Sequence, residues 1–219
     1  MALLLISIAT AARFCIRGRC LPTFLSVVAA TVIAVPAARG DIIRWDNGQR
    51  IPGTEGIVPG PGAQLNSFDL AFADLSDKNL IGASFEGSNL TSARMMRSNL
   101  ANVNLSGTNL SNSNFTPVSL TGANFEGALV YGATFNRPNG FVKEQLYSTA
   151  SFQANDLRGF KLLFHDISGW DFSGQDLTGA LFFITQFADV DLSGATIREA
   201  ALLGATDYGL VESRSGAVV

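Results

Sequence analysis

Few side chains in this sequence could carry out chemistry. It contains one histidine, His165, and two cysteines, Cys15 and Cys20. It has no Gly-x-Gly-x-x-Gly, P-loop or His-Glu-x-x-His motif. Because no nucleophile, base and orienting group come together around His165, we interpret this histidine as structural. The sequence therefore predicts a protein that is not an enzyme, with no catalytic, cofactor-binding or metal-binding residues and no cofactor.

Carboxylates are the other titratable groups, and they gather in the second half of the chain. Eight acidic residues and three basic ones lie between Ala150 and Asp207. The formal net charge of the whole chain is -3, so the basic surface that nucleic-acid binding requires is missing. We expect a solvated acidic surface that favours solubility, and we do not expect a nucleic acid as partner.

The elements that position these groups follow from a fivefold repeat. From Ala63 to Asn136 every fifth residue is large and apolar, beginning with Leu65 and ending with Phe135, in fifteen units without a register slip. A small residue often lies two positions before this central residue, Asp or Asn one position before it, and Gly two positions after it. A period of five fits neither a helix nor an alternating strand, and it indicates a repeat architecture. The central and small residues are expected to face inward, and the Gly suits a corner that requires permissive backbone angles.

The N-terminal segment has the features of a secretory signal peptide. An apolar run from Leu21 to Val35 follows three arginines, and Ala38-Arg39-Gly40 places small side chains before Asp41. Cleavage after Gly40 would export the chain to the periplasm or beyond, remove both cysteines, and leave eighteen acidic against eleven basic residues. The alternative is an uncleaved segment that holds the protein at a membrane, although the run is shorter than the ~20 residues of a full span.

The repeat units resemble the A-(D/N)-L-x-x motif of the pentapeptide-repeat family. Ala73-Asp74-Leu75, Ala123-Asn124-Phe125 and Ser98-Asn99-Leu100 match this motif closely. The resemblance implies an all-β fold, the right-handed quadrilateral β-helix, with one repeat on each face and four repeats in each coil. Residues twenty apart would then stack, with ~4.8 Å between coils.

The family also suggests an alternative function. Members that protect DNA gyrase from quinolones imitate duplex DNA with an acidic rod, so a DNA-mimic regulator of a topoisomerase is a second hypothesis. At twenty residues per coil, however, the carboxylates of the second half fall on three different faces: Asp156 with Asp176, Asp171 with Asp191, and Asp166. Export would also separate the chain from cytoplasmic gyrase. We therefore favour an exported structural or protein-binding scaffold.

A break in the repeat covers residues 137–150. Pro138-Asn139-Gly140 predicts a turn, and the segment from Lys143 to Ser148 predicts a short helix. The break is similar to the G-F-x-x-E-Q-L-Y-S-T-A-S insertion of secreted bacterial members of the family. That pattern carries Thr as helix N-cap where this chain has Val142.

The repeat resumes after the break, shifted by two positions. Its eleven central residues run from Phe152 to Leu202. The early units carry bulky residues where a small interior residue is expected, and a narrow core filled by Leu and Phe cannot accept all of them. We expect either a widened coil or outward-pointing side chains at these positions, which are Phe160, His165, Trp170 and Gln175.

One face of this second block carries a column of apolar residues. The central residues Leu162, Phe182 and Leu202 lie twenty apart, and apolar neighbours flank them. We call this column the apolar face, and its candidate contact residues are Leu163, Phe164, Leu181, Phe183, Ile184 and Leu203. Contiguous exposed apolar surface usually marks a contact site. Two interpretations stay open: the insertion 141–149 or the C-terminal tail covers the face, or an unknown protein partner or a second copy of the chain binds it.

Residues 41–62 are expected to close the first end of the repeat array. Trp45 and the turn signal Asp46-Asn47-Gly48 predict a hairpin or irregular cap over the first repeat. The predicted organisation of the whole chain is a signal peptide (1–40), a cap and linker (41–62), a first repeat block (63–136), a turn and short helix (137–150), a second repeat block (151–205) and a C-terminal tail (206–219).

Overall fold

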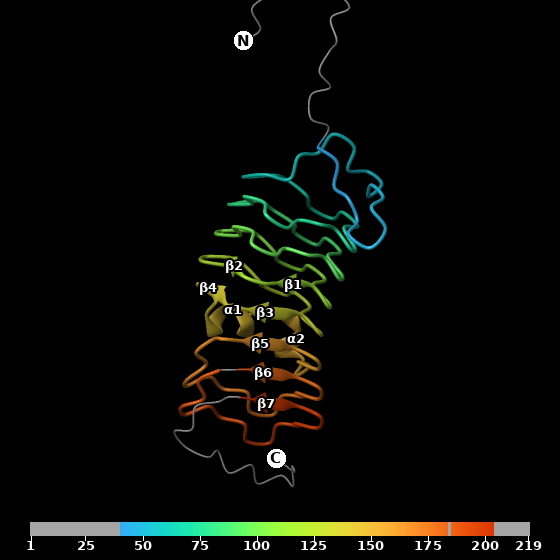
Figure 1. Ribbon diagram of the computed structural model, residues 1–219. Helices are drawn as coiled ribbons and strands as arrows, with labels where there is room; N and C mark the ends of the chain where they lie inside the picture. Colours follow the sequence, from blue (N-terminus) through green and yellow to red (C-terminus); the bar gives the residue numbers. More distant parts are fainter. Residues whose placement is uncertain (1–39, 184, 204–219) are drawn as a thin grey trace, which may run out of the picture. The chain divides into compact units, whose positions relative to one another are not determined.

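The computed structural model describes residues 40–183 and 185–203. The predicted signal peptide up to residue 39, Ile184, the predicted tail and the side chains of Leu202 and Leu203 lie outside this description. From residue 63 onward the chain winds into successive coils, and each coil lies beside the next (Figure 1). The backbone pairs from coil to coil, because residues twenty apart are bridged in parallel along the first block, as in Ser84 with Asn104 and Asn104 with Asn124.

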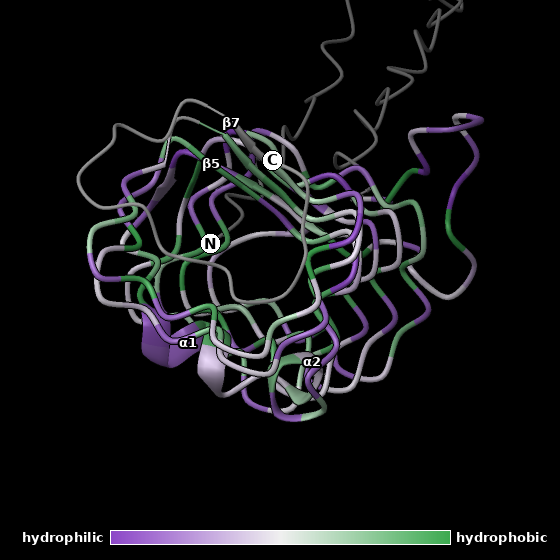
Figure 2. Cartoon of the chain, turned by 90° about the horizontal axis from the view of Figure 1, so that it is seen from below, coloured by the Kyte–Doolittle hydropathy of each residue, from purple (hydrophilic) through white to green (hydrophobic). Residues whose placement is uncertain are grey.

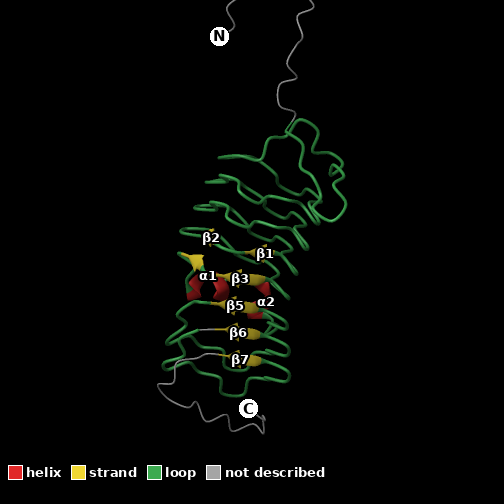
Figure 3. Cartoon of the chain, viewed as in Figure 1, coloured by secondary structure: helices red, strands yellow, loops and turns green. Residues whose placement is uncertain are grey.

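The longest sheet runs along one side of the coils. Its five short strands are parallel and follow the order β1-β3-β5-β6-β7, and β2 pairs with β4 in a second parallel sheet (Figure 3). The strands are β1 (Asn114–Phe115), β2 (Val118–Ser119), β3 (Thr134–Asn136), β4 (Pro138–Asn139), β5 (Lys161–Leu163), β6 (Leu181–Phe183) and β7 (Ala201–Leu203). The register places Leu162 beside Phe182 and Phe182 beside Leu202, as predicted from their spacing.

Each repeat unit ends in a tight corner, and two local features of the sequence make it. The residue two after the central residue adopts positive φ, for example Gly107 (φ 62°) and Ser92 (φ 57°). The Asp or Asn before the central residue accepts a hydrogen bond from the backbone N–H two residues further on, as Asn99 Oδ1 does from Ala101 at 3.1 Å. The acidic and amide residues of the motif therefore stabilise corners.

The interior is filled by the central residues of the repeats, as the period predicts. Every central residue from Leu65 to Phe135 is at most 1% exposed, and the small residues two positions before them are mostly buried as well. Phe115 and Phe135 stack with their ring centroids 4.7 Å apart and their planes 8° apart. Close packing of this kind leaves no space in the first block for a ligand inside the coil.

The predicted hairpin is present and closes the N-terminal end. Ile43 and Arg50 form an antiparallel bridge, and Arg44 pairs with Ala73 of the first coil. The Trp45 indole N–H donates to the Ser92 carbonyl at 2.7 Å, which joins the hairpin to the second coil as well. Apolar residues at both ends of the hairpin and the centres of the first coil are buried as a result.

The insertion contains two helices, where the sequence predicted one. Helix α1 (Lys143–Tyr147) lies where expected, but α2 (Ala150–Gln153) contains Phe152, which the sequence analysis counted as the first central residue of the second block. Pairing joins Phe135 to Leu162, so this coil has 27 residues and the insertion adds seven. Regular pairing resumes with Asp156 and Asp176. The prediction for Phe152 was wrong because the period of five continues through a segment whose backbone turns into a helix.

Gln145 supports α1 in the absence of a capping side chain at Val142. Its Oε1 accepts from the Val142 N–H at 2.9 Å, and its Nε2 donates to the carbonyls of Leu120 and Ala123 at 2.9 and 2.8 Å. Gln145 is buried, so these bonds satisfy groups that water does not reach.

The bulky residues at small interior positions mostly point inward. Phe160, Trp170 and Gln175 are buried, and His165 is half-buried. Phe141 from the insertion also enters the core, where its ring lies 4.7 Å from that of Phe135. Phe141 and Phe160 belong to the 27-residue coil, whereas His165, Trp170 and Gln175 lie in the twenty-residue coil that follows it.

We predict that Gln145→Leu destabilises the protein by about 2–4 kcal/mol, because the Ala123 carbonyl and the Val142 N–H lose their side-chain partner and the Leu120 carbonyl loses one of its two donors. Denaturant unfolding monitored by tryptophan fluorescence measures this change. The exposed Lys143→Gln on the same helix is the matched control and should shift the free energy of unfolding by less than about 0.5 kcal/mol. Equal effects of the two variants would contradict the role assigned to Gln145.

Candidate functional site

The apolar face forms around β5, β6 and β7. Parallel register puts Leu163 beside Phe183 and Lys161 beside Leu181, with the buried central residues between them. Leu163, Leu181 and Phe183 are half-buried, which leaves part of each side chain on the surface. The structure therefore brings together the predicted residues that it describes, while Ile184 and the side chain of Leu203 lie outside it.

Phe164 occupies the corner position of its repeat unit, at the edge of this face. Its φ of 53° is the positive φ that the residue two after the central residue adopts in the other units as well. Its ring contacts the ring of Phe183 edge-on, at 5.6 Å between centroids, and lies under the Arg137 guanidinium at 4.3 Å. These two contacts hold the aromatic ring at the corner beside the strands.

The insertion does not cover the apolar face. Figure 2 shows α1 and α2 on the side of the coil away from β5 and β7. Their contacts agree with this, because Gln145 of α1 binds the backbone of the preceding coil and Ser151 of α2 accepts from the Val130 N–H at 3.0 Å. Residues 141–149 therefore do not cover the apolar face. The other predicted cover, the C-terminal tail, lies outside the described residues.

The carboxylates of the second block lie on three sides of the coil, as predicted. Asp156 pairs with Asp176, Asp171 with Asp191, and Asp166 with Gln186. Each of these five carboxylates accepts a hydrogen bond from a backbone N–H two residues further on. They are thus spread around the coil and engaged in its corners, and they do not converge on one site.

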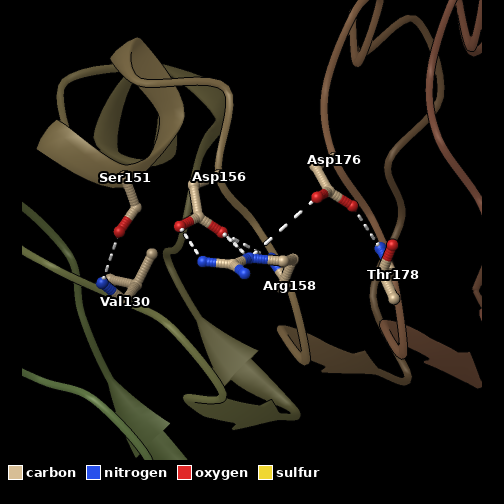
Figure 4. A network of polar contacts seen from close by, with 6 residues as sticks. All are labelled: Val130, Ser151, Asp156, Arg158, Asp176 and Thr178. Carbon is tan, nitrogen blue, oxygen red and sulfur yellow. Dashed lines mark hydrogen bonds and ion pairs between the residues drawn. The ribbon is translucent and has the colours of Figure 1, made fainter.

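Arg158 lies between the two carboxylates of one of these pairs. Its guanidinium donates two hydrogen bonds to Asp156, at 2.7 and 2.8 Å, and lies 4.0 Å from Asp176 (Figure 4). The bond from Arg158 lowers the pKa of Asp156 below its usual range. This network is a surface ion pair that joins two coils.

His165 belongs to an aromatic cluster and faces no catalytic partner in the described chain. Its ring centroid lies 6.1 Å from that of Phe141 and 5.8 Å from that of Trp170. Burial among these rings lowers the pKa of His165. Over residues 40–183 and 185–203, no group of three or more His, Cys, Asp or Glu side chains could hold a metal ion. Over the same residues, no helix is long and apolar enough to span a bilayer.

One exposed apolar pair was missed by the sequence analysis. Leu129 and Tyr131 are each 45% exposed and flank the buried Val130. Arg158 lies over the Tyr131 ring at 5.6 Å. The available signal was their position, because the other units carry mostly polar or small residues on either side of the central residue.

Comparison with known proteins identifies the repeats. The model of the pentapeptide repeats matches residues 63–100 and 98–137, in eight copies, and so covers the first block. A search of curated proteins finds no match.

A search of solved structures also finds matches, and two of the following three are described as pentapeptide-repeat proteins. One comes from the thylakoid lumen of Arabidopsis thaliana, with 14% identity and a TM-score of 0.32 over 63% of this chain and 66% of that one. Another is HetL, involved in heterocyst differentiation regulation in the cyanobacterium Nostoc sp. strain PCC 7120, with 22% identity and a TM-score of 0.22 over 66% of this chain and 61% of that one. A third is QnrB1, a plasmid-mediated fluoroquinolone resistance protein, with 17% identity and a TM-score of 0.39 over 69% and 80%. The chain thus spans less than two thirds of the length of the first two.

The lowered pKa of His165 predicts a stability change near neutral pH. The folded state favours the neutral ring, so its contribution is complete above about pH 6.5, the unfolded value, and is lost as the pH falls toward the lower folded pKa. We expect the melting temperature of the wild-type protein to drop between about pH 7.5 and about pH 5.5. His165→Phe, which keeps the aromatic packing and cannot titrate, should lose less over this range. An equal drop in both proteins would show that other groups control the effect.

Proposed function

We propose, from the premise that residues 63–137 are pentapeptide repeats, that this chain is an exported, non-enzymatic protein that serves as a structural or protein-binding scaffold. Pentapeptide-repeat proteins form right-handed β-helices and are generally structural or binding proteins. We further propose the quadrilateral form for this chain, in two blocks joined by the insertion. The twenty-residue register, four units of five, supports that form.

The observation that carries the binding function is the half-buried apolar surface beside β5 and β6. Leu163, Phe164, Leu181 and Phe183 place aliphatic and aromatic groups next to each other on a strand surface that the insertion leaves uncovered. Aromatic residues are enriched where proteins bind one another, because they offer large contact areas at low entropic cost.

The protein-binding role is favoured over catalysis by the arrangement of titratable groups. The described carboxylates of the second block bind backbone N–H groups at corners, and His165 is packed between aromatic rings. Catalysis requires several such groups to converge on one reacting atom. The partner is a protein that binds the apolar face, and a second copy of the chain is the other candidate.

Export is supported by the place of Asp41 in the folded cap. Its carboxylate accepts from the Gly56 N–H at 3.2 Å and lies 3.2 Å from the Arg50 guanidinium. A mature chain that begins at Asp41 would therefore keep the whole cap. The signal-peptide features before this residue supply the sequence argument.

The double variant Leu181→Asp with Phe183→Ser tests the binding surface. Both side chains flank a buried central residue, so we expect the melting temperature to stay within about 3 °C of the wild type. A photo-crosslinking amino acid at position 163 should give a defined crosslinked species in cells that export the protein, and the double variant should abolish it. The same crosslinker at Tyr131 serves as the control position. A crosslink that persists in the double variant would contradict the proposal, and so would a large loss of stability, which would show that the chain itself covers the face.

Cell fractionation with N-terminal sequencing tests export. We expect the mature protein outside the cytoplasm with Asp41 as its first residue, because the small-residue pattern ends at Gly40. Replacing Ala38 and Gly40 by bulky residues should block processing and leave a longer precursor. An intact Met1 in the cytosol of cells that carry the wild-type gene would overturn the proposal.

A further inference from the structure

The side of the coil that carries the apolar face differs in charge from the side half a coil away. On the first side, the outward positions are those directly before and after five buried central residues. These central residues are Met95, Phe115 (β1), Phe135 (β3), Leu162 (β5) and Phe182 (β6). The outward positions carry Arg94, Met96, Asn114, Thr116, Thr134, Asn136, Lys161, Leu163, Leu181 and Phe183, with Arg97 and Arg137 at the adjoining corner. No carboxylate occurs among these positions. One coil earlier the same columns carry Asp74, which is bridged to Arg94, and Asp77, which pairs with Arg97.

The opposite arrangement is found ten residues further along each coil. There the outward positions flank Phe85, Leu105, Phe125, Phe172 and Leu192. They carry four carboxylates, Glu86, Glu126, Asp171 and Asp191, and no lysine or arginine. Helix α1 adds one charge of each sign on this side, Lys143 and Glu144. From the coil of Arg94 onward, the described outward positions are therefore acidic on one side and weakly basic on the side with the apolar face.

Two cations lie directly against the apolar face. Lys161 is in β5 beside Leu181, and the Arg137 guanidinium covers the Phe164 ring. Arg137 is exposed and Lys161 is half-buried, so both can meet a negatively charged group. Arg97 and Arg94 lie further from the apolar face and already have partners, so they are less able to bind a carboxylate of a partner protein. Arg97 pairs with Asp77 at 2.6 Å, and Arg94 lies over the Trp45 ring at 3.7 Å.

We infer that the partner of the apolar face is an acidic polypeptide segment that also carries apolar side chains. This inference rests on the binding function proposed above and specifies the partner's chemistry. Its apolar side chains pack against Leu163, Phe164 and Phe183, and its carboxylates meet Arg137 and Lys161. Charge complementarity of this kind selects partners and speeds their encounter.

The number of cations argues for a polypeptide and against other anionic partners. Recognition of an anionic membrane surface uses clusters of about 4–8 lysines and arginines. Specific binding to nucleic acid neutralises several phosphates at once and requires a comparable number. Two cations beside an apolar surface fit a short acidic segment, where a few carboxylates accompany the apolar contacts.

Binding of three fluorescein-labelled peptides to the mature protein tests this inference. The first has the sequence Asp-Asp-Phe-Ser-Leu-Asp-Asp, the second replaces every Asp by Lys, and the third replaces Phe and Leu by Ser. We expect the first peptide to bind at least ~10-fold more tightly than the other two, since charge and apolar contacts both contribute. Arg137→Gln with Lys161→Gln should weaken its binding ~10-fold or more. Glu126→Lys, on the acidic side, is the matched control and should leave it unchanged.

The other outcomes separate this inference from the proposed function. If the acidic and basic peptides bind equally, and Leu181→Asp with Phe183→Ser abolishes both, the apolar face is a binding site and the acidic partner is wrong. If the acidic peptide binds but is insensitive to that double variant, the proposed binding surface itself is wrong. Absence of any binding to the acidic peptide, or binding to phosphatidylglycerol vesicles in its place, overturns the acidic polypeptide as partner.

Discussion

The rest of this structure depends on the backbone hydrogen bonds between neighbouring coils. Each regular coil is only twenty residues long and contains very short strands, so its N–H and C=O groups must find partners in the coils before and after it. That requirement fixes the coil length, because one residue more or less would move every later central residue out of the core. The fivefold repeat in the sequence follows from this fixed coil length, because four units of five residues make one coil. Asx hydrogen bonds and positive φ at the corners then allow the chain to turn at each unit.

The insertion lengthens one coil, yet the backbone pairing between neighbouring coils is kept. One coil has 27 residues, yet Phe135 still lies beside Leu162 and the sheet continues through β3 and β5. The seven extra residues form parts of α1 and α2, whose backbone groups are largely satisfied within the helices or by the preceding coil. Gln145 replaces the missing cap at Val142 and binds two carbonyls of that coil. The longer coil also admits Phe141 and the bulky interior residue Phe160, and Trp170 of the next coil packs against Phe141.

Side chains at the outward positions are not restricted by the backbone pairing between coils or by the core. Their chemistry therefore differs between the two sides of the coil. On the side of β1, β3, β5 and β6 the outward side chains change from polar to apolar toward the C-terminal coils. On the side half a coil away Asp171 and Asp191 keep their corner hydrogen bonds, to the N–H groups of Ser173 and Ser193 at 2.8 Å each. A surface with apolar groups and cations on one side, and acidic groups on the other, follows from residues that the core does not restrict.

The sequence by itself determined the coil. Its period of five identified the buried central residues, the small interior residues and the corner glycines, because each of these depends on local backbone geometry repeated at a fixed spacing. The turn signal Asp46-Asn47-Gly48 identified the N-terminal hairpin. It also placed Leu162, Phe182 and Leu202 on one face. The tertiary structure alone decided that Phe152 belongs to a helix and that Trp170 points into the core. It also decided that the insertion lies away from the apolar face and that Leu129 and Tyr131 are exposed. These outcomes depend on how a 27-residue coil packs against its neighbours, and a repeat of five carries no information about a coil that breaks it.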